Sequence, residues 1–209
     1  MEITEQLVRR ALALDDFDAA EAQSQMVPVP RGSRPPELAG DPREGAVLVL
    51  LYERTGRPHL VLTRRRDDLN AHAGQISFPG GRREPGEALQ NTAVREAQEE
   101  VGIDPRALTA LGELTCLYIP PTDYEVHPFV AWHHAPPIFR RQEAEVAEIV
   151  EVPLSHLLDP ATRREEPWVL HGFEVMVPYF MVDGHKVWGA TAMMLSEFLE
   201  RLRRANQER

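Results

Sequence analysis

Cysteine is almost absent from this sequence, and so are long apolar runs. Among 209 residues Cys116 is the only cysteine, so no disulfide can close within the chain and the composition gives no sign of an oxidising compartment. No stretch reaches the roughly eighteen apolar residues of a membrane span, and the acidic start lacks the basic and apolar regions of a signal peptide. We therefore expect a cytoplasmic protein without membrane contact, in which Cys116 is a buried structural thiol.

Negative charge outnumbers positive charge. The chain has 23 lysines and arginines against 33 aspartates and glutamates, a net charge of -10 and a pI near 5.3. This balance argues against a nucleic-acid partner, although short basic runs can still hold a small anion. We expect a small-molecule substrate, and the sequence leaves open a monomer or a homodimer. With 43% apolar residues, the length suits one sizeable domain, with or without appendages.

The first part of the chain differs from the rest in composition. Apolar residues recur at helical spacing over 3–22, which predicts one helix. Residues 27–45 hold five prolines, and proline fixes φ and removes a hydrogen-bond donor, so this stretch predicts an extended connector. We therefore divide the chain into an N-terminal helix and connector at 1–44 and a main domain at 45–209 that includes a C-terminal helix.

Strands dominate the expected second part. Apolar runs separated by turn residues predict a hairpin from 46–54 and 59–65, and a second hairpin across Asp183-Gly184 within 173–191. The remaining elements are expected as strands at 112–120, 124–133 and 147–153 and as helices at 87–101 and 190–209. Few helices among many strands indicate an α/β fold around a mixed sheet.

The helix expected at 87–101 carries an unusual concentration of like charge. Its apolar residues form one ridge, and Glu96, Glu99 and Glu100 lie on an arc beside that ridge at separations where side chains meet. A solvated acidic face is the common meaning of such a run. Here the carboxylates border the buried ridge and Arg95 interrupts them. Because hard divalent cations prefer oxygen ligands, we expect Mg²⁺ or Mn²⁺ among them.

The stretch that contains this helix resembles the Nudix box, a signature of fixed identities over twenty-three residues. The matching positions are Gly81, Glu87, Arg95, Glu96, Glu99, Glu100, Gly102 and the aliphatic Ile103. Ala97 departs from the pattern, because a larger aliphatic residue is usual there. The resemblance implies a Nudix-type α/β/α sandwich around a mixed β-sheet, and hydrolysis of a nucleoside diphosphate linked to another moiety.

The resemblance also implies roles for these residues. Glu96, Glu99 and Glu100 would hold the divalent metal, Glu87 would complete or support that set, and Arg95 would orient the carboxylates. Glu99 and Glu100 would thereby take part in catalysis together with Arg95. The general base is left open between Glu99 and a residue of the later acidic segment, for which we choose Glu145.

The segment just before the box, residues 61–81, resembles the extra signature of the coenzyme A pyrophosphatase branch of Nudix hydrolases. It departs from that signature at Val61, Arg66 and Asn70. The positions in and around it that could bind substrate are Arg64, Arg65, Arg66, Gly80, Gly81 and Phe78. The arginines suit phosphate and the glycines could offer backbone N–H groups, whereas each could equally be a solvated charge or a plain turn. Phe78 could be a pocket wall or part of the core.

The function implied is metal-dependent hydrolysis of coenzyme A, and of its thioesters, to 3′,5′-ADP and 4′-phosphopantetheine. Two alternatives stay open. The first is a Nudix pyrophosphatase for another nucleoside diphosphate derivative, such as NADH, ADP-ribose or an oxidised deoxynucleotide. The second is a Nudix-like binding module without catalysis, which the complete set of glutamates disfavours.

Overall fold

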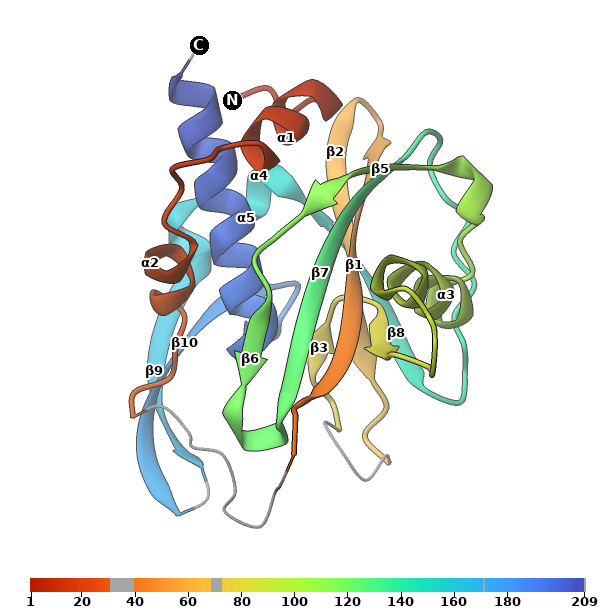
Figure 1. Ribbon diagram of the computed structural model, residues 1–209. Helices are drawn as coiled ribbons and strands as arrows, with labels where there is room; N and C mark the ends of the chain where they lie inside the picture. The colour runs from red at the N-terminus through yellow and green to blue at the C-terminus, as the bar shows by residue number, and fades with distance from the viewer. Residues whose placement is uncertain (31–39, 69–72, 171, 209) are drawn as a thin grey trace.

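A mixed sheet lies between two helical layers in the computed structural model, which describes residues 1–30, 40–68, 73–170 and 172–208 (Figure 1). Helix α3 (Leu89–Val101) packs on one face, against the central strand β1 (Arg43–Arg54). Helix α5 (Gly189–Gln207) covers the other face, beside α1 (Glu5–Leu12) and α2 (Ala19–Ser24). The predicted α/β/α sandwich around a mixed sheet is confirmed.

The described residues form a large sheet of eight strands and a small sheet of three. The large sheet runs β3-β2-β1-β7-β5, with β4 on β1, β6 on β7 and β8 on β2; β1 and β7 are parallel and the other pairs are antiparallel. Its remaining strands are β2 Arg57–Arg65, β3 Ile76–Ser77, β4 Gly80–Arg82, β5 Leu108–Glu113, β6 Leu117–Ile119, β7 Tyr124–His133 and β8 Val146–Pro153. The small antiparallel sheet consists of β9 Arg163–Leu170, β10 Phe173–Val182 and β11 His185–Trp188.

Strand β1 is apolar on both sides because helices cover both faces of the sheet. Val49 and Leu51 belong to the core shared with α5, whereas Leu48 and Leu50 belong to the core shared with α3. Strand β1 then turns back into β2 through two residues with positive φ, the conformation that a two-residue hairpin turn requires. The continuous apolar run therefore identified the centre of the sheet.

Two expected elements are each divided in the structure. The single helix predicted at 3–22 is wrong: α1 ends at Leu12, and α2 begins after Asp18, whose carboxylate caps it by accepting from the Glu21 N–H at 2.9 Å. The single strand predicted at 112–120 is β5 and β6, which both pair with β7. The break occurs where the Thr115 N–H turns away to the carboxylate of Glu197 on α5, at 3.1 Å.

Three further features differ from the expectations. Strand β9 was not predicted, because its sequence is polar and contains a proline, as the outer strand of a small sheet tolerates. Cys116 is an exposed residue, so the expectation of a buried cysteine is wrong. Of the connector expected at 27–45, residues 31–39 lie outside the described residues, and β1 already begins at Arg43.

The helices before the connector contribute to the same core as the C-terminal helix. Leu7 and Met26 are fully buried in one cluster with Phe198 of α5. Glu197, also fully buried, accepts hydrogen bonds from Gln23 at 2.8 Å, Thr115 and, at 2.9 Å, Arg201. The Glu197 carboxylate thus joins α2 and the β5–β6 connection to α5. Within the described residues, no helix combines the length and apolar character that a bilayer crossing needs.

Candidate active site on helix α3

Helix α3 presents its carboxylates beside a buried apolar ridge, as the sequence predicted. Ala93, Ala97 and Val101 are completely buried against the sheet. The helix ends at Gly102, whose left-handed φ of 73° allows its N–H to bond to the Gln98 carbonyl. The small Ala97 side chain, the one departure inside the signature, lets the helix lie close to β1.

Arg95 connects most of the acidic groups at the start of the helix. Its guanidinium donates to Glu87 at 2.9 and 3.1 Å, to Glu96 at 2.8 Å and to Glu99 at 3.4 Å. Hydrogen bonds from Arg95 and Thr92 lower the pKa of Glu87 to about 2. One arginine thus supplies positive charge to three carboxylates. Because Glu87 is already engaged by Arg95 and Thr92, its position suits a supporting role more than direct metal ligation.

Glu100 has the opposite surroundings. The side chain is buried, with 8% of the residue exposed, and its Oε2 atom has no hydrogen-bond partner among the described residues. Burial, together with the charges of Glu96 and Glu145, raises the pKa of Glu100 to about 8. Burial also raises the pKa of Glu96. An unpartnered buried oxygen beside two more carboxylates is a donor set that fits a divalent cation.

Gly80 and Gly81 are explained by close approach rather than by backbone freedom. They form β4 and pair with Val47 and Ala46 of β1. A Cβ atom on Gly81 would lie 2.5 Å from the carboxylate carbon of Glu96, and one on Gly80 would lie 2.4 Å from the Ala46 carbonyl oxygen. These glycines therefore let the carboxylates reach the sheet edge, and the backbone of Gly80 partly offsets the rise in the pKa of Glu100.

The arginines predicted upstream of the box are paired with nearby acids. Arg64 lies 2.8 Å from Asp67 and Arg66 lies 2.6 Å from Asp68, while Arg65 lies 3.5 Å from Glu145. Glu145 also lies close enough to Glu100 for its negative charge to raise the pKa of Glu100. The structure thus brings Glu145, the chosen base, to the glutamates of α3. Asn70, where the upstream signature has arginine, lies outside the described residues.

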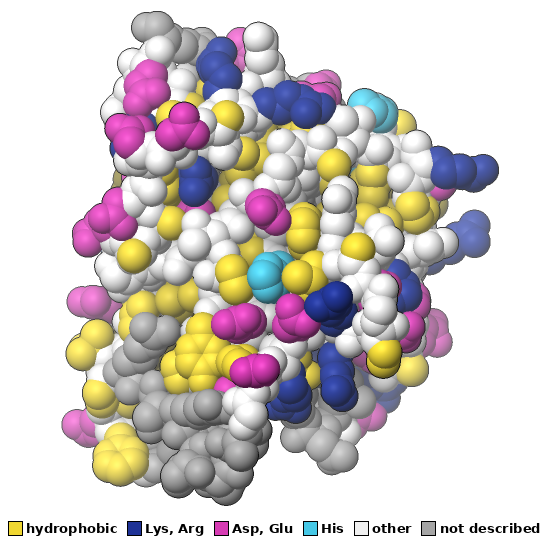
Figure 2. Space-filling view, viewed as in Figure 1, with side chains coloured by type: hydrophobic (Ala, Val, Ile, Leu, Met, Phe, Trp, Pro, Cys, Tyr) yellow, Lys and Arg dark blue, Asp and Glu magenta, His cyan; other side chains and the backbone are white. Residues whose placement is uncertain are grey.

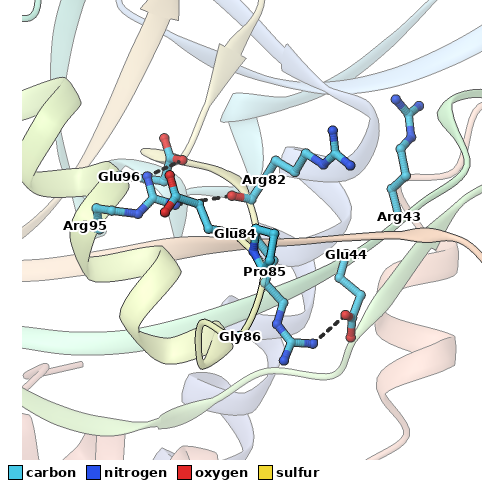
Figure 3. Close-up of a pocket in the computed structure, with 9 residues that line it drawn as sticks. Arg43, Glu44, Arg82, Glu84, Pro85, Gly86, Arg95 and Glu96 are labelled. Carbon is cyan, nitrogen blue, oxygen red and sulfur yellow. Dashed lines mark hydrogen bonds and ion pairs between the residues drawn. The ribbon is translucent and has the colours of Figure 1, made fainter.

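A cleft of about 780 Å³ opens beside Arg95 and Glu96 (Figure 3). The residues that line it are Arg43, Glu44, Arg82, Arg83, Glu84, Pro85, Gly86, Arg95 and Glu96. None of the three upstream arginines is among these lining residues. The space-filling view shows basic and acidic side chains intermixed in the lower right of one face (Figure 2).

The cleft arginines were missed by the sequence analysis. Arg82 and Arg83 follow the Gly-Gly pair directly, within the variable part of the box, so their position was a usable signal. Arg83 is paired with Glu44, and Arg43 stacks over the ring of Tyr124 at 4.3 Å. The Arg82 side chain makes no hydrogen bond or ion pair to the described part of the chain, and its carbonyl accepts from Arg95. Arg82 is therefore the cation most available to an incoming anion.

Phe78 is not a wall of this cleft. Its side chain is 1% exposed and packs in the core shared with α5. Phe78 is therefore a core residue and not a pocket wall. Gln142 is a further residue that the sequence did not single out: its N–H bonds to the Glu100 carbonyl at 2.9 Å, and its buried Oε1 has no partner among the described residues.

Comparison with known proteins agrees with this geometry. Residues 42–172 match the NUDIX domain model. The chain is 33% identical over 192 residues to a protein of Photorhabdus laumondii named uncharacterized Nudix hydrolase NudL, covering 91% of this chain and 98% of that one. It is 34% identical over 161 residues to a NudL protein of Yersinia pestis, covering 77% and 80% of the two chains.

Solved structures share the fold. A MutT protein from Methanosarcina mazei aligns with a TM-score of 0.53 at 20% identity, over 82% of this chain and 99% of that one. The Nudix hydrolase RenU of M. smegmatis aligns with a TM-score of 0.50 at 18% identity, over 81% and 89%. The domain match, which includes β1, the glutamates of α3 and the cleft between them, establishes that this chain belongs to the Nudix hydrolases and is a Nudix diphosphatase.

Proposed function

We propose that this diphosphatase hydrolyses the diphosphate bond of coenzyme A, with Mg²⁺ or Mn²⁺ as its metal, in the cytoplasm. The products would be 3′,5′-ADP and 4′-phosphopantetheine, and thioesters of coenzyme A would be cleaved at the same bond. The observation that carries the proposal is the upstream segment 61–81, which keeps most of the coenzyme A signature immediately before the glutamates of α3.

The charges around the site support a substrate with more than one anionic group. Arg82 and Arg43 face the cleft on one side of Glu96, while Arg65 lies 3.5 Å from Glu145 and Arg64 pairs with Asp67 and, at 3.8 Å, with Glu148. A guanidinium group can form bidentate hydrogen bonds to phosphate. Two separate groups of arginines therefore suit a ligand that carries a 3′-phosphate apart from its diphosphate. The Asp67 and Glu145 partners would have to be exchanged for phosphate when the substrate binds.

The residues of α3 would hold and orient the reacting groups. Glu96, Glu99 and Glu100 are proposed as metal ligands, with Arg95 and Glu87 fixing their positions. When bound, a divalent ion neutralises the diphosphate and lowers the pKa of a water ligand. The oxygen of water attacks one phosphorus in line, the bond from that phosphorus to the bridging oxygen breaks, and the bridging oxygen leaves with the other phosphate. Glu145 is proposed to accept the proton of the attacking water, with Glu99 as the second candidate.

Product analysis with coenzyme A tests the substrate. The full chain is incubated with coenzyme A and either Mg²⁺ or Mn²⁺, and kcat/KM is compared with the values for NADH, ADP-ribose and an oxidised deoxynucleotide triphosphate. Coenzyme A should have the highest kcat/KM. A higher value for any of the other three would assign the enzyme to that substrate and end the coenzyme A proposal.

Substitution of Arg65 tests how the 3′-phosphate is read. Arg65→Ala should raise KM for coenzyme A more than for its dephospho form, because only the former carries the 3′-phosphate. Arg106→Ala is the matched control, since this arginine is highly exposed and pairs only with Asp104 among the described residues. Equal effects of Arg65→Ala on the two substrates would remove this role from Arg65.

A further inference from the structure

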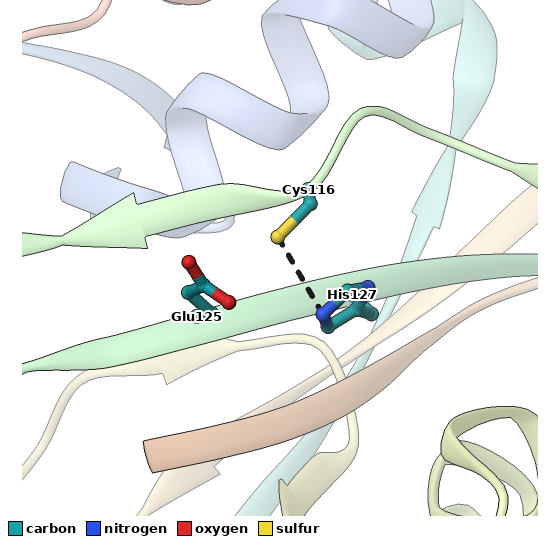
Figure 4. Close-up of side chains that lie close together, drawn as sticks. All are labelled: Cys116, Glu125 and His127. Carbon is teal, nitrogen blue, oxygen red and sulfur yellow. Dashed lines mark hydrogen bonds between the residues drawn. The ribbon is translucent and has the colours of Figure 1, made fainter. Parts of the chain in front are cut away.

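A second group of potential metal ligands lies on strands β6 and β7, outside the glutamate set of α3. Cys116, Glu125 and His127 each present one donor atom, and these three atoms lie within 4.8 Å of one another (Figure 4). Glu125 and His127 alternate along β7 and so project from the same face of the sheet. Cys116 directly precedes β6 and continues its antiparallel register, which pairs Leu117 with Val126.

The geometry of the group matches a particular class of metal. The Cys116 Sγ and His127 Nε2 atoms are 3.6 Å apart. A tetrahedral zinc ion with a Zn–S distance of about 2.3 Å and a Zn–N distance of about 2.05 Å separates these two ligand atoms by about 3.6 Å. The half-buried Glu125 has a carboxylate oxygen within 4.8 Å of both atoms, so rotation of its side chain can offer a third ligand. Thiolate, imidazole and carboxylate together select Zn²⁺ or a similar borderline cation, whereas Mg²⁺ rarely accepts sulfur.

The group adjoins the substrate cleft. Glu125 is the register partner of Glu44 across the parallel β1–β7 pair, and Glu44 lines the cleft. Partial burial raises the pKa of the Cys116 thiol, and so do the negative charges of Glu125, Glu44 and Glu113. The surroundings of the sulfur are therefore acidic, and a bound cation would offset that charge.

We propose that Cys116, Glu125 and His127 form a binding site for Zn²⁺, separate from the hard-cation site of α3 and next to the edge of the substrate cleft. The three protein ligands leave a fourth position for water. The ion joins the segment between β5 and β6 to β7 by a cross-strand link, so it stabilises the folded chain in addition to any effect on the cleft.

Cobalt absorption tests the proposal independently of enzyme activity. The full chain is titrated with Co²⁺ in excess Mg²⁺, which occupies oxygen-only sites. Wild type should give a thiolate-to-cobalt charge-transfer band that saturates at one ion per chain and disappears on addition of Zn²⁺. His127→Ala and Glu125→Gln should each weaken the ion's binding by at least about tenfold. His134→Ala, at an exposed histidine just past the end of β7, should titrate like wild type.

Thermal unfolding with Zn²⁺ and a variant of the α3 site complete the test. Zn²⁺ should raise the melting temperature of wild type but not of Cys116→Ser, and Glu96→Gln should leave the cobalt titration unchanged. A titration without a thiolate band would overturn the site. So would a His127→Ala variant that binds Co²⁺ as tightly as wild type, because the cysteine would then act without its neighbours.

Discussion

Glu100 is the carboxylate of α3 with the least support from the protein. Arg95 reaches Glu87, Glu96 and Glu99, whereas Glu100 Oε2 has no partner within the described chain. With a pKa of about 8, this buried acid is mainly protonated at neutral pH, so a cation that binds there must displace the proton. The proposed ligand role therefore predicts that metal and proton compete at one oxygen pair.

Replacing this acid should separate activity from folding. Glu100→Gln keeps the shape and neutrality of the protonated acid, so the melting temperature without metal should be unchanged or higher. Turnover with Mg²⁺ should fall at least about 10–100-fold, the range found for residues that merely orient metal ligands. Steady-state kinetics and thermal unfolding measure the two effects, with the exposed Glu113→Gln as control. Unchanged turnover in Glu100→Gln would exclude Glu100 from the site.

The same group gives a pH dependence to the metal-free protein. Its pKa is about 8 in the folded chain and its ordinary value is 4.5. Because the folded chain holds this proton more tightly than the unfolded chain, protonation of Glu100 stabilises the fold at a pH below the ordinary pKa. That stabilisation is lost as pH rises toward the pKa of the folded chain. In a chelator, the free energy of unfolding should therefore fall between about pH 5 and pH 8, by at most about 1.4 kcal/mol per unit. Glu100→Gln should lack this slope in denaturant titrations, and a shared slope would contradict the assignment.

At the scale of elements, α3 can approach β4 so closely only because Gly81 of β4 has no side chain where the Glu96 carboxylate lies. Gly81→Ala would place a Cβ atom 2.6 Å from both Glu96 carboxylate oxygens, so the flexible side chain must move. We expect a small loss of stability but weaker Mg²⁺ affinity, by at least about tenfold, because a ligand is displaced. Calorimetry of Mg²⁺ binding measures this.

Gly86 supplies the matched control for that substitution. Gly86→Ala meets no atom within 4 Å, but its φ of 78° strains an alanine. This variant should lose about 1 kcal/mol of stability and keep its Mg²⁺ affinity. If both variants weakened the metal equally, backbone strain in the loop would explain the result and the crowding of Glu96 would not.

Elements were predictable where local chemistry determined them. The β1–β2 hairpin and α3 have their own turns, caps and apolar patterns, and both are confirmed. The break between β5 and β6 depends on Glu197, more than eighty residues further along the chain, so no local pattern reveals it. The glutamates of α3 were found by their fixed spacing. Arg82 and Arg83 could have been predicted from their place directly after the Gly-Gly pair, whereas Arg43 lines the same cleft only because β1 and β4 pair in the folded chain.

At the scale of the whole molecule, the buried Glu197 and Arg201 of α5 hydrogen-bond to both N-terminal helices, through Gln23 of α2 and the Ala11 carbonyl of α1. Glu197→Ala would leave Arg201, of which only 10% of the side chain is exposed, without its carboxylate, together with Gln23 and Thr115. Breaking a buried pair costs about 3–5 kcal/mol. Denaturant unfolding should show this loss, while kcat/KM per folded molecule stays unchanged, because the pair lies on the face of the sheet opposite α3.

Glu200→Ala on the same helix is the control for that loss. Glu200 pairs with Arg203, and both side chains are about one-third exposed. Its removal should cost less than about 1 kcal/mol. Similar losses in the two variants would mean that helix propensity, rather than the buried pair, sets the stability of α5.

The parallel pairing of β1 with β7 has a consequence during synthesis. Residues 43–54 leave the ribosome long before residues 124–133, yet these segments are neighbours at the middle of the sheet. Until the later segment emerges, one edge of the earlier, very apolar strand has unpaired backbone N–H and C=O groups that can pair with another polypeptide. Nascent or truncated chains that stop short of residue 133 should thus depend on chaperones far more than the finished protein does.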